Sequence, residues 1–586
     1  MSSAVLVSTR GLKFRPPPRP AGCGPEEFFV GVWWPRSEAI VVEFPDDAES
    51  AEGPNWALAG SRSPVAEDRR RLVHGDARGG IAFRGYLLEP AVHGWCDARD
   101  VLDAWWERAP DVPNGVFAVA RLDDRIGELE LAVDALGVGS LYYRRWGNAV
   151  LFATSPRYLR LPGDRLDALA WRLRISAGSV TGDDSLVEGI RRAPPGCRVR
   201  FSADGSSAVE SYLPGDFLGA EVRPLDDEAL ERVEAALHRA IQRCTSLPGL
   251  SAVLPLSAGH DSRRILGALL QLGVPFDALT VRIPDRQGRD VDARFAIELA
   301  EKYGFPHRVL DLPRAGPYTA LDRDRRLLMH GESLHHTWIL PLCNSLPSRP
   351  SMVFEGLAGD ALGETGYVRP ALVRPDVSAR ELCDLLAGQA FEPLFRAPFW
   401  PSREAACARL LGWLERLPAF QRGEWVFLLT RTRREIGAWS QRLVPAGHVT
   451  VYPYVDLDYL RAAFAIDAAA KIKDSLQHRC LAAFHPELAA VPGSRAVPPD
   501  LPRGEIRDLD ALELACLRAL DSDVKGVDAA RLREVLPWRL RAMHRLARRS
   551  RSMAARVGWW RNAVLEMLAV ERHARPAWDP ADGDGR

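Results

Sequence analysis

The sequence has no excess of either charge, no paired cysteines and no long apolar run, and each absence excludes a class of protein. Lys plus Arg and Asp plus Glu each number 77 among 586 residues, so the net charge gives no argument for binding nucleic acid. The nine cysteines include no Cys-x-x-Cys pair, which argues against a disulfide framework and against a zinc site. No window approaches the length of a membrane span, and residues 1–10 lack the charged and apolar regions of a signal peptide. We therefore expect a cytoplasmic protein with buried thiols, no membrane span and no nucleic-acid partner.

Residues 252–272 carry the pattern of a strand, a tight turn and a helix. An apolar run ends at Ser257, small residues follow it, and apolar residues recur at helical spacing after Asp261. A helix that begins there presents unpaired N–H groups and the positive end of its dipole, which together bind a phosphate group. Asp261 would repel that phosphate unless a Mg²⁺ ion bridged the two. Ser, Gly and Asp are also common in ordinary turns, so the pattern alone leaves a plain strand-to-helix connection equally open.

The segments after this helix continue the alternation of strands and helices. Residues 277–283 have the pattern of a second buried strand, residues 292–303 that of a helix, and residues 309–311 that of the start of a third strand. With these segments the chain resembles the synthetase half of the class B asparagine synthetases, a family of ATP-pyrophosphatases. The family's Ser-Gly-Gly-x-Asp-Ser loop is matched by Ser257, Ala258, Gly259, His260, Asp261 and Ser262.

Three further elements carry the same resemblance in the same order. The family's Asp, two Ala, Gly and His are matched by Asp292, Ala296, Ala300, Gly304 and His307. Its Gly-acidic-Gly-small-Asp segment is similar to Gly356, Leu357, Ala358, Gly359 and Asp360. Its Pro-Phe-Leu-Asp segment and basic sequel are similar to Pro453, Tyr454, Val455 and Asp456, followed by Lys471 and Lys473. Four elements in the right order make the resemblance specific.

Short apolar segments separated by Gly, Pro and Asp fill the N-terminal third. They alternate or run apolar over strand lengths, and a helix is expected among them at residues 100–108. The expected strands are residues 28–34, 39–44, 80–86, 115–121 and 128–133. Residues 134–156 and 181–196 resemble the glutaminase half of the same family, which has the layered fold of the N-terminal-nucleophile (Ntn) hydrolases.

The expected fold class is α/β, with an Ntn-hydrolase-like αββα sandwich followed by a parallel-sheet, HUP-like ATP-pyrophosphatase domain with helical additions. We place a degenerate glutaminase-like domain at residues 1–215, an asparagine-synthetase-like ATP-binding domain at residues 225–499 and a helical, Arg-rich extension at residues 500–586. Gly and Pro cluster at residues 213–224, which marks a linker, and an amphipathic helix is expected after it. A helix-rich insertion is expected over residues 377–417.

The residues that the family uses to hydrolyse glutamine are missing. The family has a Cys at position two, whose freed α-amine serves as the base for the thiol, whereas this chain has Ser2. The family grips glutamine partly through an Asn-Gly-Glu segment. Its counterpart, residues 83–87, reads Phe-Arg-Gly-Tyr-Leu and has neither Asn nor Glu. The resemblance therefore implies a glutaminase-like domain that hydrolyses no glutamine.

The synthetase site also departs from the family, on the side of the amine. Leu357 stands where the family has a Glu that assists the amine, while Asp360 is retained as the second metal-binding Asp. The family's catalytic Lys aligns with Arg495, which keeps the positive charge but does not shuttle a proton at neutral pH. Lys471 and Lys473 stay open as alternatives for that role. Bases that could replace the missing Glu are Glu332, His335, His336, Glu355 and Glu364.

The resemblance implies ATP and Mg²⁺ as cofactors. Residues 257–262 would bind the phosphates, the backbone near Val281 and Ile283 would lie against the adenine, and Asp261 and Asp360 would hold Mg²⁺. Gly356 and Gly359 are expected beside the triphosphate. A substrate carboxylate would attack the α-phosphate, pyrophosphate would leave, and an amine would capture the acyl-adenylate to give an amide and AMP.

The implied activity is that of an AMP-forming carbon–nitrogen ligase. Loss of the glutaminase residues and of the amine-side carboxylate favours coupling of two groups on one bulky, peptide-like substrate, as in the lasso-peptide cyclases, because an amine carried by the substrate arrives at high effective molarity. A protease or a peptide-carrier protein is the expected partner. An ammonia-dependent asparagine synthetase, a beta-lactam synthetase-like enzyme and a non-catalytic scaffold stay open. A sulfur-transferring ATP-pyrophosphatase acting on RNA is disfavoured by the missing Cys-x-x-Cys pair and the neutral net charge.

Overall fold

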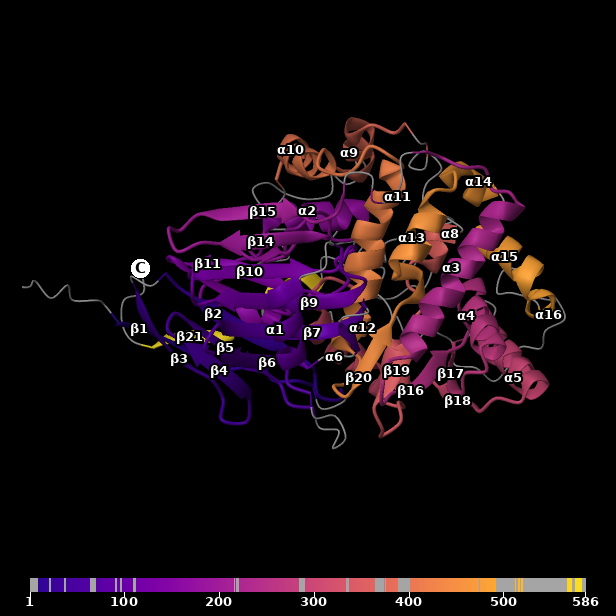
Figure 1. Ribbon diagram of the computed structural model, residues 1–586, viewed down its shortest axis with the longest axis horizontal. Helices are drawn as coiled ribbons and strands as arrows, with labels where there is room; N and C mark the ends of the chain where they lie inside the picture. The colour runs from indigo at the N-terminus through magenta and orange to yellow at the C-terminus, as the bar shows by residue number, and fades with distance from the viewer. Residues whose placement is uncertain are drawn as a thin grey trace, which may run out of the picture.

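The computed structural model of the chain has two halves that lie side by side (Figure 1). Strands coloured indigo to purple make up the N-terminal half, and helices around a smaller sheet make up the other. The structure describes residues 9–20, 23–35, 38–63, 70–89, 92–94, 97–108, 112–214, 217, 221–283, 290–333, 337–363, 374, 376–387, 401–473, 475–491, 512, 515–516, 518–519, 566–571 and 575–581.

Two antiparallel sheets form the body of the N-terminal half. The six-stranded sheet has the order β13-β11-β12-β2-β5-β4, and the seven-stranded sheet has the order β15-β14-β10-β9-β7-β6 with β8 beside β7. The strands of the first sheet are β2 (Phe29–Trp33), β4 (Glu49–Gly53), β5 (Trp56–Gly60), β11 (Tyr142–Trp146), β12 (Ala149–Ala153) and β13 (Arg191–Arg192). Those of the second are β6 (Val73–Asp76), β7 (Gly79–Glu89), β8 (Val92–Gly94), β9 (Gly115–Asp123), β10 (Glu128–Val133), β14 (Cys197–Phe201) and β15 (Ser207–Ser211).

The alternation of side chains along each strand places one row of them between the two sheets. In β2, Phe29 and Trp33 belong to the core between the sheets, while Val30 and Val32 belong to the core on the opposite face. Both faces of β2 are covered, so every residue of this strand is buried. The strands predicted at residues 28–34, 39–44, 80–86, 115–121 and 128–133 are present, as is the helix predicted at residues 100–108.

The two outer layers of this sandwich differ in kind. Helix α1 (Ala98–Arg108) packs against the outer face of the seven-stranded sheet. The outer face of the six-stranded sheet is covered by a small sheet of order β21-β1-β3. Its strands are β1 (Thr9–Phe14), β3 (Ala39–Glu43) and β21 (Trp578–Ala581).

These layers correct two predictions. Over the described residues, the sandwich predicted as αββα has a helix on one side and a β layer on the other. Residues 578–581, predicted to lie in a helical extension, form a strand that pairs antiparallel with β1. Phe14 and Trp578 face each other in this pair, with ring centroids 5.0 Å apart. Burial of these aromatic side chains offsets the weak strand tendency of the segment Trp-Asp-Pro-Ala.

A parallel sheet is the centre of the second half, as predicted. Its strand order is β18-β17-β16-β19-β20, and every neighbouring pair is parallel. The strands are β16 (Ser251–Pro255), β17 (Phe276–Arg282), β18 (His307–Asp311), β19 (Ser351–Phe354) and β20 (His448–Val451). The surrounding helices are α3 (Asp227–Thr245), α4 (His260–Gln271), α5 (Val291–Tyr303), α6 (Ala315–Met329), α7 (Ile339–Cys343), α8 (Gly359–Gly363), η5 (Pro453–Val455), α13 (Leu457–Phe464), α14 (Ala468–Lys473), α15 (Leu476–Phe484) and α16 (Pro486–Ala489).

A helical segment stands between the two halves (Figure 1). Between the halves lie α11 (Arg422–Phe427), the π-helix η4 (Leu428–Ile436) and α12 (Gly437–Arg442). The two helices that precede them, α9 (Ala379–Ala387) and α10 (Arg403–Leu414), lie at the top of the view. α9 and α10 pack against α2 (Ala168–Ala177), which follows the short helix η1 (Pro156–Leu159). The helix-rich insertion predicted at residues 377–417 is therefore present in its described part.

Buried arginines of η4 attach this segment to the N-terminal half. Arg433 donates hydrogen bonds to the backbone oxygens of Gly137 (3.0 Å) and Ala193 (2.6 Å). Arg434 donates to the backbone oxygen of Gly182 (2.7 Å). Burial lowers the pKa of Arg433 to about 9, so carbonyl acceptors are needed to compensate the desolvation of this charge. Among the described residues, no helix is both long and apolar enough to cross a membrane.

Candidate functional site

The loops that follow β16 and β19 lie where the strand order of the parallel sheet reverses. From β16 the chain passes through α4 to β17 and through α5 to β18 on one side, and it later returns to β19 on the other side of β16. Two loops that leave such neighbouring strands in opposite directions open a crevice at the carboxyl edge of the sheet, where open α/β sheets bind their ligands. The two loops are residues 256–259 and 355–358, in which the first and third sequence elements noted above begin; the elements continue into α4 and α8.

Serine hydroxyls and Asp292 hold the first loop in a tight turn. The hydroxyl of Ser262 donates to the Ser257 carbonyl oxygen (3.1 Å), and Ser257 Oγ accepts from the N–H of Gly259 (3.1 Å). The N–H of Ala258 donates to Asp292 Oδ1 over 2.8 Å. Burial raises the pKa of the Asp292 carboxyl. The N–H groups of Leu256 and Ser257 also donate, to the Leu279 carbonyl oxygen and the Ser262 hydroxyl, so all four backbone N–H groups of the loop are used within the protein.

Helix α4 begins directly after this loop. Its N-cap residue, Gly259, makes no side-chain hydrogen bond to the helix. The positive end of the helix dipole lies at this first turn. Together with the helix dipole, an N-terminus of this kind is suited to an anion such as a phosphate group.

Asp261 lies directly against the second loop. A Cβ atom on Gly359 would lie 2.6 Å from Asp261 Cγ, and one on Gly356 would lie 3.1 Å from Asp261 Cβ. The absence of a side chain at both glycines thus permits the close approach. The Tyr454 hydroxyl donates to the backbone oxygen of Asp261 (2.8 Å), which ties the start of α4 to η5. Because Gly359 precedes Asp360, the two predicted metal-binding carboxylates come from segments in direct contact.

Two charged groups accompany Asp360. Arg431 Nη1 lies 3.4 Å from Asp360 Oδ2. Glu355 follows β19 and is half-buried. This burial, and next the negative charge of Asp360, raise the pKa of its carboxyl to about 8. A carboxyl with that pKa holds a proton at neutral pH and exchanges it just above, which is a property of acid–base residues.

The predicted adenine contact falls at the end of β17. This strand pairs with β18 as far as Arg282, which is opposite Asp311. The side chain of Val281 belongs to an apolar cluster, and that of Ile283 packs against the same cluster. Ile283 is the first residue beyond the strand and lies outside the β17–β18 register. Residues 284–289, which follow, lie outside the described residues.

Two predicted catalytic residues lie in buried ion pairs. Lys471 Nζ is 2.5 Å from Glu424 Oε1 and donates to the Ala463 backbone oxygen (3.0 Å). Glu332 Oε1 is 2.9 Å from Arg434, and its Oε2 is 2.6 Å from Arg442. These arginines hold the pKa of the Glu332 carboxyl well below its usual range, although burial alone would raise it. Both roles remain predictions, and the ion pairs show that each side chain also holds structure together.

Other predicted residues lie outside the described part of the chain. They are Ser2, His335, His336, Glu364 and Arg495. Lys473 ends α14, but its side chain is not among those described. Their roles stay predictions.

Sequence reasoning missed two residues that support the second loop. Arg431 contacts Asp360 from the π-helix η4. No sequence pattern predicts such a helix. Gln477 of α15 donates its Nε2 to the Gly359 backbone oxygen (2.7 Å). An Arg–Asp pair and an amide–carbonyl contact between distant segments carry no local sequence signal.

Two sizeable cavities lie elsewhere. One of about 780 Å³ lies between β-strand residues such as Tyr143 and helical residues such as Trp413, and one of about 420 Å³ lies beside α6 around Arg326. Among the described residues, neither cavity is lined by a residue of the two loops. The candidate site is thus identified by topology and side-chain chemistry rather than by enclosed volume.

Comparison with known proteins gives two sequence matches. Residues 91–160 match the family described as a glutamine amidotransferase domain. A curated relative, asparagine synthetase [glutamine-hydrolyzing] 3 of Bacillus subtilis (strain 168), is 30% identical over 209 residues, which are 33% of this chain and 32% of the relative. The match thus spans about a third of the length of that relative. Both matches support a relation to asparagine synthetase-like proteins.

Two solved structures are also similar in part. They are the glutamine phosphoribosylpyrophosphate amidotransferase from B. subtilis in complex with ADP and GMP, and an allosteric regulatory enzyme of purine biosynthesis. The identities are 11% and 10%, and each match covers 49% of this chain and 75% of the other with a TM-score of 0.20. At this TM-score the likeness carries no argument about fold or activity.

Proposed function

We propose that this protein is an ATP-dependent ligase that activates a substrate carboxylate as an acyl-adenylate and couples it to an amine. The observation that carries the proposal is the contact of Asp261 with Gly359, which brings the carboxylate-bearing first turns of α4 and α8 together at the switch point of a parallel sheet. The N-terminus of α4 on the same edge, where the helix dipole is positive, supports phosphate binding. The similarity to an asparagine synthetase supports the class of reaction.

The residues at this edge suit Mg²⁺. Asp261 and Asp360 offer carboxylate oxygens, the ligands that this ion prefers when it also binds phosphate. When bound, the ion would neutralise charge on the triphosphate. Arg431 beside Asp360 adds a positive charge that the described side chains already place there.

The proposed reaction has two steps, and the second needs a base from the protein. A carboxylate oxygen of the substrate attacks the α-phosphorus, the bond from that phosphorus to the β-phosphate bridge breaks, and pyrophosphate leaves toward the N-terminus of α4. The amine nitrogen then attacks the acyl carbon, and AMP leaves with the electron pair of the broken C–O bond. The amine must lose a proton in this step. Glu355, whose carboxyl has a pKa of about 8, is the described group that we assign to accept it in its deprotonated form.

The proposed reaction does not include glutamine hydrolysis. In the segment that corresponds to the family's glutamine grip, Phe83 and Leu87 are buried in an apolar core. The hydroxyl of Tyr86 accepts a hydrogen bond from the N–H of Tyr452 (3.0 Å), which joins the two halves. The cavity beside this segment measures about 20 Å³, room for about one water molecule and not for an amino acid. These contacts support a structural role for the domain.

We further propose that both reacting groups belong to one bulky, peptide-like substrate, as in a lasso-peptide cyclase. Without a source of ammonia inside the protein, an amine carried by the substrate has the advantage of high effective molarity. Ammonia-dependent formation of asparagine and beta-lactam synthesis are the competing chemistries within the same class.

The test uses the purified chain with Mg²⁺-ATP and candidate acids. Release of AMP and pyrophosphate, lost in Asp261→Asn and Asp360→Asn without a change in the circular dichroism spectrum, is the expected result. Release of ADP and phosphate would place the protein in another ligase class, and absence of turnover with every acid would favour a scaffold. Efficient amide formation from aspartate and ammonium, measured by mass spectrometry, would overturn the peptide-coupling proposal alone.

A further inference from the structure

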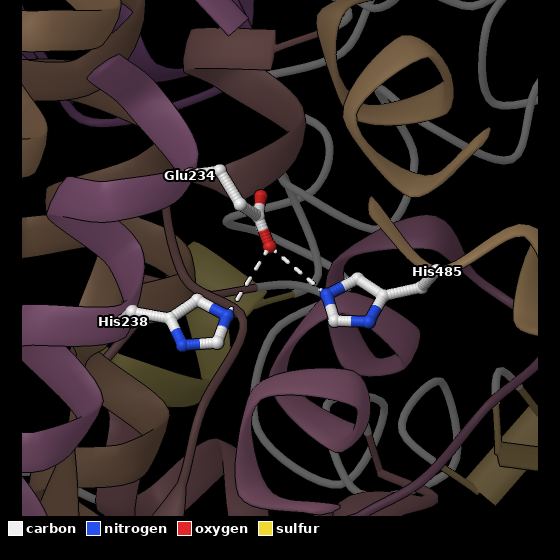
Figure 2. Close-up of side chains that lie close together, drawn as sticks. All are labelled: Glu234, His238 and His485. Carbon is white, nitrogen blue, oxygen red and sulfur yellow. Dashed lines mark hydrogen bonds and ion pairs between the residues drawn. The ribbon is translucent and has the colours of Figure 1, made fainter. Parts of the chain in front are cut away.

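Three side chains outside the candidate site gather at the junction of α3, α4 and α15. Glu234 and His238 are one helical turn apart on α3, and therefore lie on the same face of that helix. His485 is the residue that joins α15 to α16. Figure 2 shows the carboxylate of Glu234 between the two imidazole rings.

The two rings direct the same kind of atom toward Glu234. His485 Nε2 lies 2.9 Å and His238 Nε2 lies 3.6 Å from Glu234 Oε1. The two rings are parallel within 4°, with centroids 6.2 Å apart. One ligand atom from each of the three residues lies within 4.8 Å of the other two. A small displacement of the carboxylate would let all three atoms reach one ion.

We propose that Glu234, His238 and His485 form a site for a divalent transition-metal ion of the zinc type. Two imidazole nitrogens and one carboxylate oxygen are a ligand set that such ions use with a further water, and that Mg²⁺ and Ca²⁺ do not favour. The missing Cys-x-x-Cys pair argues against a cysteine-ligated zinc site, and this site has no cysteine ligand. Glu234 and His485 are buried and His238 is partly exposed, so the ion enters from the side of His238.

Arg264 supplies the second layer of this site. Its Nη2 lies 2.5 Å from Glu234 Oε2, which leaves Oε1 directed toward the imidazoles. A ligating carboxylate is commonly held in this way by a hydrogen-bond donor on its other oxygen. The same guanidinium repels a cation, so we expect a weaker site than one in which Glu234 had a neutral partner.

The ring of His485 is held by close packing against α4. A Cβ atom on Gly267 would lie 2.5 Å from its Nδ1, so a larger residue at that position would push the ring away. Gly267 therefore offers a way to disturb the metal geometry without removing a ligand.

The site is connected to the second loop of the candidate active site. Arg264 donates from Nη1 to the side-chain oxygen of Gln477, and Gln477 in turn donates to the backbone oxygen of Gly359 (2.7 Å). An ion that fixes Glu234 would thus steady the chain of contacts that leads to the residue before Asp360. We infer a structural ion that clamps α3 to α15.

Cobalt(II) is the probe for the test. The full chain, first stripped of metal with a chelator, is titrated with Co²⁺ while its visible d–d absorption is recorded. We expect a band that saturates at one ion per chain and that Zn²⁺ abolishes by competition, together with a rise in the melting temperature. His238→Ala should lose the band, because His238 is a ligand, while its circular dichroism spectrum stays unchanged.

Two further variants separate a metal site from an ordinary hydrogen-bonded cluster. Gly267→Ala should weaken Co²⁺ binding by at least about tenfold, since it displaces a ligand ring. His74→Ala, on the edge strand β6 of the other half, should leave the band and the affinity as in the parent chain. No band with the parent chain, or a band that persists in His238→Ala, would overturn the proposal. The three residues would then be a carboxylate hydrogen-bonded to two imidazoles.

Discussion

Asp292 and Ala258 are 34 positions apart in the sequence and are joined by a 2.8 Å hydrogen bond from the Ala258 N–H to Asp292 Oδ1. The bond anchors the first loop to the start of α5. It thereby fixes the turn that delivers the N-terminus of α4 to the crevice. Loop geometry at the candidate site therefore depends on a side chain from the next helix along the chain.

Removal of this anchor should weaken ATP binding. A hydrogen bond to a charged group contributes about 1.5–3 kcal/mol, so we expect Asp292→Ala to raise the Kd for Mg²⁺-ATP by roughly tenfold or more. Isothermal titration calorimetry would measure this Kd for the parent chain and the variant. Asp292→Asn keeps an acceptor oxygen and should retain most of the affinity. Equal affinities for the Ala variant and the parent chain would show that the anchor is not needed.

Glu355 should make the fold less stable as the pH rises. Its carboxyl pKa is raised from 4.5 to about 8 in the folded chain. The folded state thus holds more protons than the unfolded state between these values, and stability falls with rising pH across that window. Urea denaturation at several pH values should show a loss of up to a few kcal/mol. Glu355→Gln should flatten this dependence, whereas the exposed control Glu43→Gln should not.

Glu355 should also divide the proposed reaction into its two parts. Formation of the acyl-adenylate needs no base of this kind, but capture of the amine does. We expect Glu355→Gln to retain exchange of labelled pyrophosphate into ATP and to lose amide formation by about 10²-fold or more. Equal losses in both assays would assign Glu355 to the architecture of the loop instead.

Glu332 should contribute chiefly to stability. Its carboxylate is shared by Arg434 and Arg442 and accepts from the Tyr142 hydroxyl at 2.8 Å. Glu332→Gln would leave buried arginines without their counter-charge, and the expected loss is about 3–5 kcal/mol in the free energy of unfolding. For the exposed pair Lys13–Glu43, Glu43→Gln should cost less than about 1 kcal/mol. A fully stable but inactive Glu332→Gln protein would restore the catalytic interpretation.

Ala358 occupies a backbone conformation that suits glycine. Its φ is 73°, in the left-handed region that costs an L-residue about 1–2 kcal/mol. Ala361, in α8, is buried to a similar degree. Both Ala→Gly changes remove a buried methyl group and raise the conformational entropy of the unfolded chain. Ala358→Gly should therefore be less destabilising than Ala361→Gly by about 1–2 kcal/mol in chemical denaturation. Equal losses in the free energy of unfolding for the two variants would show that the backbone at Ala358 is not strained.

The sequence was sufficient for the elements that repeat a local pattern. The run 252–256 with small residues after it predicted β16 and the start of α4, because strand and helix periodicities and turn residues are properties of neighbours in sequence. The strands of the sandwich were predicted for the same reason. The ordering of the loops around one crevice came from the resemblance, and the strand order of the sheet agrees with it.

Long-range partners were beyond sequence reasoning. The contact of Arg431 with Asp360 joins residues 71 positions apart, and that of Gln477 with Gly359 joins residues 118 positions apart. Strand β21 falls in the region 500–586 that was predicted as a helical extension, and the partner that makes it a strand is β1. The buried ion pairs of Glu332 also carry no local signal, since Arg434 and Arg442 belong to η4 and α12 and lie 102 and 110 positions away in the sequence.

The pairing of β1 with β21 determines which part of the N-terminal half can fold last during synthesis. After the residues of β1 have been synthesised, almost all of the chain must still be made before Trp578 is available to pack against Phe14. Until then the apolar face formed by Val30 and Val32 lacks this last strand, and contacts so distant in sequence form slowly. The outer β layer is thus the last part of the N-terminal half to be completed.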